Sequence, residues 1–384
     1  MSTINAETAV RERYTAGAKA AEAKLCCPVD YNPEYLKVIP QEVIDRDYGC
    51  GDPSQYLREN ETVLDLGSGT GKICFIAAQI VGSSGKVIGI DMTDEMLNVA
   101  RSSAPIVAER IGYSNVEFRK GRIQDLALDL EKLDAELKAR PITDAASFLR
   151  ADELAQELRI KHPLVVTDSV DVVVSNCVLN LVEPKSKRHL FEEIFRVLKK
   201  GGRAVISDIV SDEDVPKHLQ NDPELWSGCI AGALTEEGLL QAFSEAGFYG
   251  IQILNRDEEP WQTVEGIEFR SVTIEAFKGK QGPCFERNQA VIYRGPFREV
   301  LDDDNHRMER GVRYAVCDKT YNLYRKGPYR EFFEFVEPLA DIPLGEAKPF
   351  DCSHTARRHP KETKGQDYNV TTEASSCCDG GSCS

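Results

Sequence analysis

The sequence predicts an α/β protein built on a parallel sheet with helices on both faces. Between about residues 61 and 209, short apolar segments of strand length alternate with segments whose apolar residues recur at helical spacing. A glycine-rich turn follows the first of these strands. This alternation favours parallel strands joined by crossover helices. At 384 residues the chain is long enough for two domains.

The predicted elements follow one another in a regular order. Five strands are expected, at residues 62–66, 87–90, 116–119, 169–175 and 203–209. Helices are expected at 72–81, after Thr93 as a capping residue, and over the apolar positions from Leu190 to Leu198. The last of these helices is predicted to end with Lys199, Lys200 and the glycines 201–202, because basic residues and glycine are typical of helix ends.

Four regions differ in composition. Residues 1–60 are polar and helix-like, and 61–279 hold the predicted sheet. Within the latter, 127–162 is a charged, mostly helical insertion that we expect to be peripheral. Short strands and turns predict a small α+β domain over 280–350, with a strand at 290–293. Residues 351–384 are expected to be a flexible, disordered tail, ending in Cys377, Cys378 and Cys383.

Composition excludes several partners. The formal net charge of −16 argues against nucleic acid and against an anionic membrane surface, both of which favour basic proteins. The sequence has no run of about 18 apolar residues, so no transmembrane helix is predicted. The amino-terminal segment lacks the apolar core of a signal peptide, so we expect a cytoplasmic protein, and a monomer. Twelve cysteines in a reducing compartment favour metal binding or redox chemistry over structural disulfides.

The segment 63–71 predicts a ligand-binding loop. It runs Val-Leu-Asp-Leu-Gly-Ser-Gly-Thr-Gly, a strand followed by a turn whose glycines let the backbone approach a ligand closely. Asp91 follows Gly71 by twenty residues, at the end of the next strand, where a carboxylate can accept ribose hydroxyls. A dinucleotide enzyme is the rival interpretation, but its loop has the pattern G-x-G-x-x-G. Here the pattern is G-x-G-x-G, with Asp65 two residues ahead.

Three cysteines stand at positions that suggest a binding site. Cys50 lies just before the sheet, Cys177 directly after the fourth strand, and Cys229 after the fifth. Ligands of open α/β sheets bind at the carboxyl ends of the strands, so Cys177 is expected beside the glycine loop. A soft thiolate there suggests a soft substrate, with a small core residue as the competing interpretation of Cys177.

The chain resembles a known family at these motifs. The glycine loop resembles the first motif of class I methyltransferases, and residues 121–125 resemble the segment that flanks adenine in them. The segments Tyr-Gly-Cys-Gly at 48–51, Ser-Asn-Cys-Val-Leu-Asn-Leu-Val at 175–182 and Leu-Trp-Ser-Gly-Cys at 225–229 resemble those of the arsenite S-adenosylmethionine methyltransferases. The resemblance implies a class I fold with a Rossmann-like sheet, S-adenosylmethionine as cofactor, and methylation of arsenite or methylarsenite in arsenic detoxification.

The resemblance also implies roles for individual residues. Cys177 and Cys229 become the direct ligands of trivalent arsenic, with Cys50 as the third thiol, and the arsenic-binding segment extends over about 210–279. Cys26 or Cys27 is implied as the partner of Cys50 in a disulfide relay, which glutathione or thioredoxin restores. The implied cofactor contacts are Tyr48, Asp65, Gly67, Ser68, Gly69, Asp91, Met92, Gly121, Ile123 and Asn176.

Two alternative functions differ in their use of the cysteines. A class I methyltransferase of another small molecule, such as a sterol or quinone, needs an apolar pocket and has no use for Cys50 or Cys229. A thiol-based metalloid- or zinc-sequestering protein keeps the fold without turnover. The chain lacks the tight C-x-x-C pair typical of zinc sites.

Overall fold

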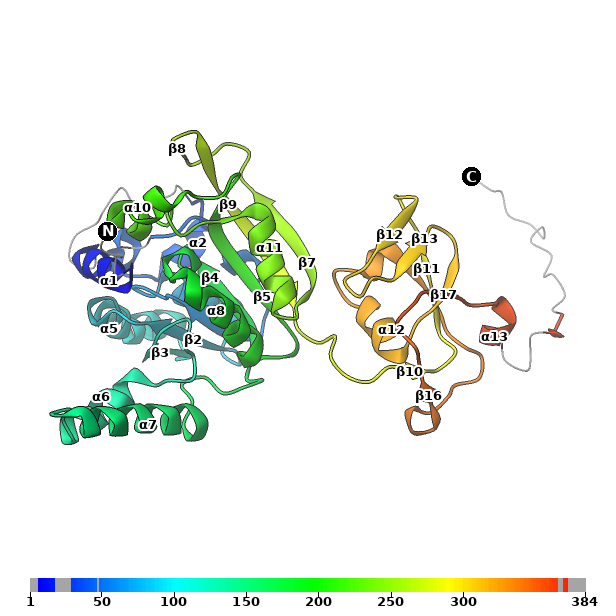
Figure 1. Ribbon diagram of the computed structural model, residues 1–384, viewed down its shortest axis with the longest axis horizontal. Coiled ribbons are helices and arrows are strands. Elements are labelled where there is room, and N and C mark those ends of the chain that lie inside the picture. Colours follow the sequence, from blue (N-terminus) through cyan, green and yellow to red (C-terminus); the bar gives the residue numbers. More distant parts are fainter. Residues whose placement is uncertain (1–5, 18–28, 47, 365–368, 372–384) are drawn as a thin grey trace. The chain divides into compact units, whose positions relative to one another are not determined.

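The computed structural model describes residues 6–17, 29–46, 48–364 and 369–371 (Figure 1). The chain divides into two compact units, residues 1–279 and 280–384. Cys26, Cys27 and the tail cysteines Cys377, Cys378 and Cys383 lie outside the described residues. Within the described ranges no helix has the length and apolar character needed to cross a membrane.

The first unit is built on one large sheet. Its strands are β1 (Thr62–Leu66), β2 (Lys86–Asp91), β3 (Val116–Lys120), β4 (Val170–Asn176), β5 (Leu198–Ser211), β7 (Tyr249–Arg256) and β9 (Ile267–Phe277), in the order β3-β2-β1-β4-β5-β9-β7. The first five strands are parallel, as predicted. β9 is antiparallel to both β5 and β7, so the expectation of a wholly parallel sheet is wrong at this edge. Antiparallel neighbours need only a short connection, which the segment between β7 and β9 provides.

Helices cover both faces of this sheet. α4 (Lys72–Val81) and α5 (Asp94–Ile111) pack on one face, and α8 (Pro184–Val197) and α11 (Glu236–Glu245) pack on the other. Neighbouring residues of a strand serve opposite cores: Val63 belongs to the core with α4, and Leu64 to the core with α8. Figure 1 shows α8 and α11 lying across the sheet. Helices on both faces bury the central strands β1 and β4 almost completely, as their apolar sequences predict.

Two local predictions are wrong. α8 ends at Val197, and the residues predicted as its last turn open β5 instead. Leu198 pairs with Val170, and the register of β4 and β5 shifts before Arg203 joins, so Gly201 lies in an irregular strand with φ of 87°. Thr93 occupies the capping position of α5, but its side chain makes no capping hydrogen bond.

Short elements complete the first unit. The predicted insertion forms two helices, α6 (Leu130–Ala139) and α7 (Ala145–Lys161), which lie side by side in Figure 1. The remaining elements are α1 (Ala6–Gly17), α2 (Pro33–Leu36), α3 (Gln41–Asp45), α9 (Lys217–Gln220), α10 (Pro223–Ser227), β6 (Leu234–Thr235) and β8 (Gln262–Val264).

The second unit is a small α+β structure. Its main sheet has the order β15-β11-β14-β17, with β11 at Ala290–Tyr293 as predicted, β14 at Arg313–Ala315, β15 at Phe333–Val336 and β17 at Ala356–Arg357. Two further ladders pair β10 (Phe285–Glu286) with β16 (Lys348–Pro349) and β12 (Glu299–Leu301) with β13 (Arg307–Glu309). Tyrosines dominate the core. Tyr293 comes from β11, and Tyr321 and Tyr324 come from α12 (Asp318–Tyr324).

The predicted disordered tail begins too early. Residues 351–364 include β17 and α13 (Pro360–Lys364). Arg358 and Thr363 are buried in this segment, and Arg358 pairs with Glu286 at 2.7 Å. A polar sequence therefore joins the fold through buried ion pairs, which composition does not reveal.

Candidate active site

A cavity of about 770 Å³ opens at the carboxyl ends of β1, β2 and β4. This volume suits a cofactor-sized molecule, and the position is the usual one for ligands of open α/β sheets. All ten residues predicted as cofactor contacts lie in its wall: Tyr48, Asp65, Gly67, Ser68, Gly69, Asp91, Met92, Gly121, Ile123 and Asn176.

The glycine loop forms one wall of this cavity. Gly67 and Gly69 have φ of 69° and 51°, a backbone region that favours glycine, and a Cβ on Gly67 would lie 2.6 Å from Val178. The carboxylate of Asp91 accepts hydrogen bonds from the Gly69 amide at 2.9 Å and the Thr93 amide at 2.8 Å. Since the Gly69 amide already donates to a carboxylate, the loop is poorly arranged for a pyrophosphate. Burial raises the pKa of Asp91, and these hydrogen bonds oppose the rise.

Several segments contribute wall residues that the sequence did not predict, among them α1 and α7. α1 contributes Glu7, Val10 and Tyr14, and α7 contributes Gln156 and Arg159. The expectation that the insertion is peripheral is therefore wrong for α7. Val10 and Tyr14, spaced four residues apart on an otherwise polar helix, were the only local sign of a buried face.

Arg159 connects the insertion to the adenine-flanking segment. Its guanidinium contacts the carboxylate of Asp125 at 2.8 Å, and both residues line the cavity. At the same wall, Arg122 pairs with Glu7 of α1 at 2.7 Å. The segment 121–125 is thus held from two sides.

The three predicted arsenic ligands come together beside this cavity. Cys50, Cys177 and Cys229 are all buried and belong to one apolar cluster. The ligand atoms of Cys50, Cys177 and Asp208 lie within 4.8 Å of one another. The Cys229 thiol donates a hydrogen bond to the Cys177 carbonyl at 3.0 Å, and the thiols of Cys50 and Cys229 both influence the pKa of Cys177. Because Asn176 and Val178 line the cavity, Cys177 lies at its edge.

Asn176 holds the loop that carries Cys50. Its side-chain oxygen accepts hydrogen bonds from the amides of Cys50 at 2.9 Å and Gly51 at 3.2 Å, and its side-chain nitrogen donates to the Gly51 carbonyl at 2.7 Å. The flanking glycines are required for close packing: a Cβ on Gly49 would collide with the Asn176 amide, and one on Gly51 would lie 2.7 Å from the Ser207 hydroxyl. The Tyr-Gly-Cys-Gly motif thus holds Cys50 against the end of β4, at Asn176.

The other two cysteines occupy strained backbone. Cys177 and Cys229 have φ of 63° and 64°, in the left-handed region that residues with a Cβ rarely adopt. Such conformations cost about 1–3 kcal/mol and concentrate at functional sites. Cys177 is further fixed by its amide, which donates to the Ser207 carbonyl at 2.8 Å.

Cys177 and Cys229 are thiols in the free protein at neutral pH. A hydrogen bond from Cys229 lowers the pKa of Cys177, but the hydrogen bond with Cys50 and burial outweigh it and leave that pKa well above its ordinary value. The hydrogen bond with Cys177 and burial raise the pKa of Cys229 in the same way. Burial and these contacts therefore keep Cys177 and Cys229 uncharged.

Two ionisable side chains, those of Asp208 and Lys187, lie next to the thiols. Burial raises the pKa of Asp208 to about 6, although the amides of Leu179 and Ile209 donate to its carboxylate at 2.8 Å each. Burial lowers the pKa of the neighbouring Lys187 to about 8. Asp208 also contributes to the raised pKa of Cys177.

The fold and site together define a class I S-adenosylmethionine-dependent methyltransferase. A family model described as a methyltransferase domain matches residues 57–247, and one described as a domain of unknown function matches residues 280–368. The structure of the arsenic (III) S-adenosylmethionine methyltransferase from Chlamydomonas reinhardtii aligns with a TM-score of 0.54 and 26% identity, covering 85% of this chain and all of that one. The predicted fold class is confirmed.

Sequence relatives identify the family. The arsenite methyltransferase of Aquipseudomonas alcaligenes is 33% identical over 327 residues, covering 81% of this chain and 84% of the relative. The arsenite methyltransferase of Homo sapiens is 30% identical over 329 residues, covering 82% of this chain and 76% of the relative. The chain therefore belongs to the arsenite methyltransferase family.

Proposed function

We propose that this protein transfers methyl groups from S-adenosylmethionine to trivalent arsenic held by Cys50, Cys177 and Cys229. The observation that carries the proposal is that three buried cysteines from three separate segments belong to one apolar cluster beside the cofactor cavity, with the ligand atoms of Cys50 and Cys177 within 4.8 Å and the Cys229 thiol on the Cys177 carbonyl at 3.0 Å. Arsenite and methylarsenite are the proposed acceptors. A methyltransferase of another small molecule, such as a sterol or quinone, would not need this arrangement of cysteines.

The cavity fits S-adenosylmethionine in its chemistry. Its wall includes the carboxylates of Asp65 and Asp91, which suit a cationic ligand, whereas the wall carboxylates of Glu7 and Asp125 are paired with Arg122 and Arg159. Ser68 lines the cavity, and its buried hydroxyl has no hydrogen-bond partner among the described residues. When bound, the cofactor supplies a methyl group on a positively charged sulfur.

The cysteines bind arsenite without a change of charge. Three S–H groups exchange with three As–OH groups, forming three As–S bonds and releasing three molecules of water. Arsenic remains trivalent and keeps its lone pair, which is the nucleophile. No general base is needed, because the nucleophile loses no proton. The protein contributes mainly position, which supplies up to about 7–11 kcal/mol in favourable cases.

Cysteines also supply the electrons that the cycle needs. Methylation of the lone pair raises arsenic to the pentavalent state, and two thiols return it to the trivalent state by forming one disulfide. Cys50 and Cys177 are close enough for such a pair, with sulfur atoms within 4.8 Å. Cys26 or Cys27 is the proposed relay partner of Cys50, and glutathione or thioredoxin is the proposed reductant. Both assignments rest on the family resemblance.

The test measures methylated arsenic directly. Purified protein is incubated with S-adenosylmethionine, arsenite and a thiol reductant, and arsenic species are separated by chromatography with elemental detection. We expect methylated arsenic from the unchanged protein, none from Cys177→Ser or Cys229→Ser, and unchanged output from Cys284→Ser, which removes a thiol of the second unit. Cofactor binding is measured calorimetrically in each variant.

The possible outcomes separate the alternatives. Product formed equally by Cys177→Ser and Cys229→Ser would overturn the ligand assignment. An unchanged protein that binds the cofactor but yields no methylated arsenic would overturn the proposed reaction and favour another small-molecule acceptor. Retention of arsenic without turnover would favour sequestration.

A further inference from the structure

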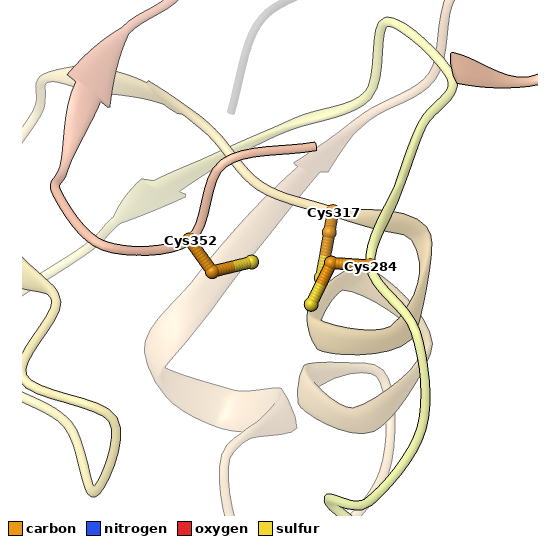
Figure 2. Close-up of side chains that lie close together, drawn as sticks. All are labelled: Cys284, Cys317 and Cys352. Carbon is orange, nitrogen blue, oxygen red and sulfur yellow. The ribbon is translucent and has the colours of Figure 1, made fainter. Parts of the chain in front are cut away.

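The second unit contains its own cluster of three cysteines. The sulfur atoms of Cys284, Cys317 and Cys352 lie within 4.8 Å of one another, and Figure 2 shows the three side chains converging. They come from separate segments: Cys284 precedes β10, Cys317 precedes α12, and Cys352 follows β16. Cys317 is buried, whereas the other two are partly exposed, so a small solute can reach the cluster.

Contacts that do not involve sulfur hold these segments together. The β10–β16 ladder pairs Phe285 with Pro349, and the amide of Phe350 donates to the Cys284 carbonyl at 2.9 Å. Arg287 joins the end of β10 to the start of α12 through its ion pair with Asp318 at 2.7 Å. The three thiols are thus brought together by the fold itself, with no need for a disulfide.

The local environment prepares two of the sulfurs for bonding. The amide of Thr320 donates to the Cys317 sulfur at 3.3 Å. Burial opposes ionisation of Cys284, but hydrogen bonds from Cys352 and Cys317 and the nearby charge of Lys319 outweigh it and lower its pKa. Cys352 stays protonated, because burial and its hydrogen bonds to the other two thiols raise its pKa.

The number of ligands distinguishes the ions that the cluster suits. Structural zinc sites take four protein ligands. Among the described residues, the cluster contains three potential ligands and no histidine or carboxylate. The neighbouring His306 is occupied: its Nδ1 contacts Asp302 at 2.9 Å, and the ring also bonds the Cys352 backbone. Trivalent arsenic binds three sulfurs in a pyramid and prefers soft ligands.

We propose that Cys284, Cys317 and Cys352 form a second binding site for trivalent arsenic, distinct from the methyl-transfer site. Arsenite, As(OH)₃, exchanges its three hydroxyl groups for the three sulfurs. Three As–O and three S–H bonds break, three As–S bonds and three waters form, and arsenic keeps its oxidation state. The choice of arsenic over other three-coordinate soft ions rests on the proposed function, but binding requires neither cofactor nor turnover.

The test measures arsenic binding in full-length protein that cannot use its other thiols. The background variant carries serine at Cys50, Cys177 and Cys229, and at Cys26, Cys27, Cys377, Cys378 and Cys383. Reduced protein is titrated with arsenite under anaerobic conditions, and bound arsenic is counted by native mass spectrometry. We expect one arsenic per chain, located by peptide mapping to Cys284, Cys317 and Cys352.

A matched pair of single substitutions identifies the ligands. Adding Cys284→Ser should weaken arsenic binding at least about tenfold, because one of three As–S bonds is lost. Adding Cys74→Ser removes one thiol outside the cluster and should change nothing. Circular dichroism verifies that each variant is folded.

Two results would overturn the inference. One is arsenic binding that Cys284→Ser leaves unchanged. The other is tight binding of zinc by the reduced cluster with no displacement by arsenite, which would make it a metal site of another kind. Neither readout depends on methyl transfer, so this inference and the proposed function fail independently.

Discussion

The thiol of Cys229 donates a hydrogen bond to the backbone carbonyl of Cys177 across 3.0 Å, and both residues have left-handed backbone. The two sulfurs are thus placed by peptide geometry as well as by packing. Left-handed conformations at residues with a Cβ are costly and persist only where the surrounding structure enforces them.

This strain predicts an unusual order of stability. Cys177→Gly should have a larger free energy of unfolding than Cys177→Ala by about 1 kcal/mol, because glycine adopts positive φ without a clash. The control is Cys74 inside α4, where Gly should be less stable than Ala by about 1 kcal/mol. Urea unfolding of the four variants measures both differences. An alanine variant at 177 as stable as the glycine variant would show that the backbone there is not strained.

We expect the carboxylate of Asp91, at the end of β2, to contribute to the affinity for the cofactor. Asp91→Asn should weaken binding of S-adenosylmethionine by about tenfold to a hundredfold, the range for losing a hydrogen bond to a charged group. Asp94→Asn is the matched control, because Asp94 pairs with Lys120 at 2.7 Å and does not line the cavity. Isothermal titration calorimetry compares the two. Equal affinities would remove Asp91 from the cofactor site.

We also expect Arg159, in the insertion, to affect the KM for the cofactor. Arg159→Ala should raise the KM for S-adenosylmethionine about fivefold, because it releases Asp125 from a partly exposed ion pair. Lys161→Ala, which breaks the exposed pair with Glu157 on the same helix, should leave the KM unchanged. Steady-state kinetics at saturating arsenite distinguish them. A larger effect from Lys161→Ala would indicate that the helix as a whole matters, and not its contact with the cavity.

The raised pKa of Asp208 predicts that the stability of the protein depends on pH. Its folded pKa of about 6 exceeds the ordinary value of 3.8, so between these pH values the folded state is protonated while the unfolded state is ionised. The stabilisation is complete below pH 3.8 and is lost as the pH rises through 6, amounting to about 3 kcal/mol. Unfolding in urea from pH 4 to 7 should show the wild type losing stability relative to Asp208→Asn. A constant difference would contradict the raised pKa.

Some parts of this molecule were predictable because they depend on local pattern. The helix at 72–81 and the strand at 62–66 have the predicted bounds, since period and flanking glycines specify them. All ten residues predicted as cofactor contacts line one cavity, because they belong to short motifs that meet at one edge of the sheet. Cys50, Cys177 and Cys229 were singled out by their positions in the chain, and their role as arsenic ligands was taken from the family resemblance.

Other parts depend on contacts between distant segments. Tyr14 and Arg159 reach the cavity only because α1 and α7 fold over it. Cys352 was placed in a disordered tail, since nothing local shows that the ladder between β10 and β16 sets it beside Cys284. The antiparallel direction of β9 likewise leaves no trace in a buried strand, whose residues are apolar in either direction.

Tyr14 belongs to both halves of the active site, because it lines the cofactor cavity and its hydroxyl is hydrogen-bonded to Cys229. A displacement of this ring by either ligand is therefore felt by the other. Thermodynamic linkage makes such an effect reciprocal: the factor by which bound cofactor changes the affinity for arsenite is the factor by which bound arsenite changes the affinity for cofactor. If arsenite binds at Cys229 as proposed, one tyrosine on an amino-terminal helix would make the loading of the two substrates a coupled event.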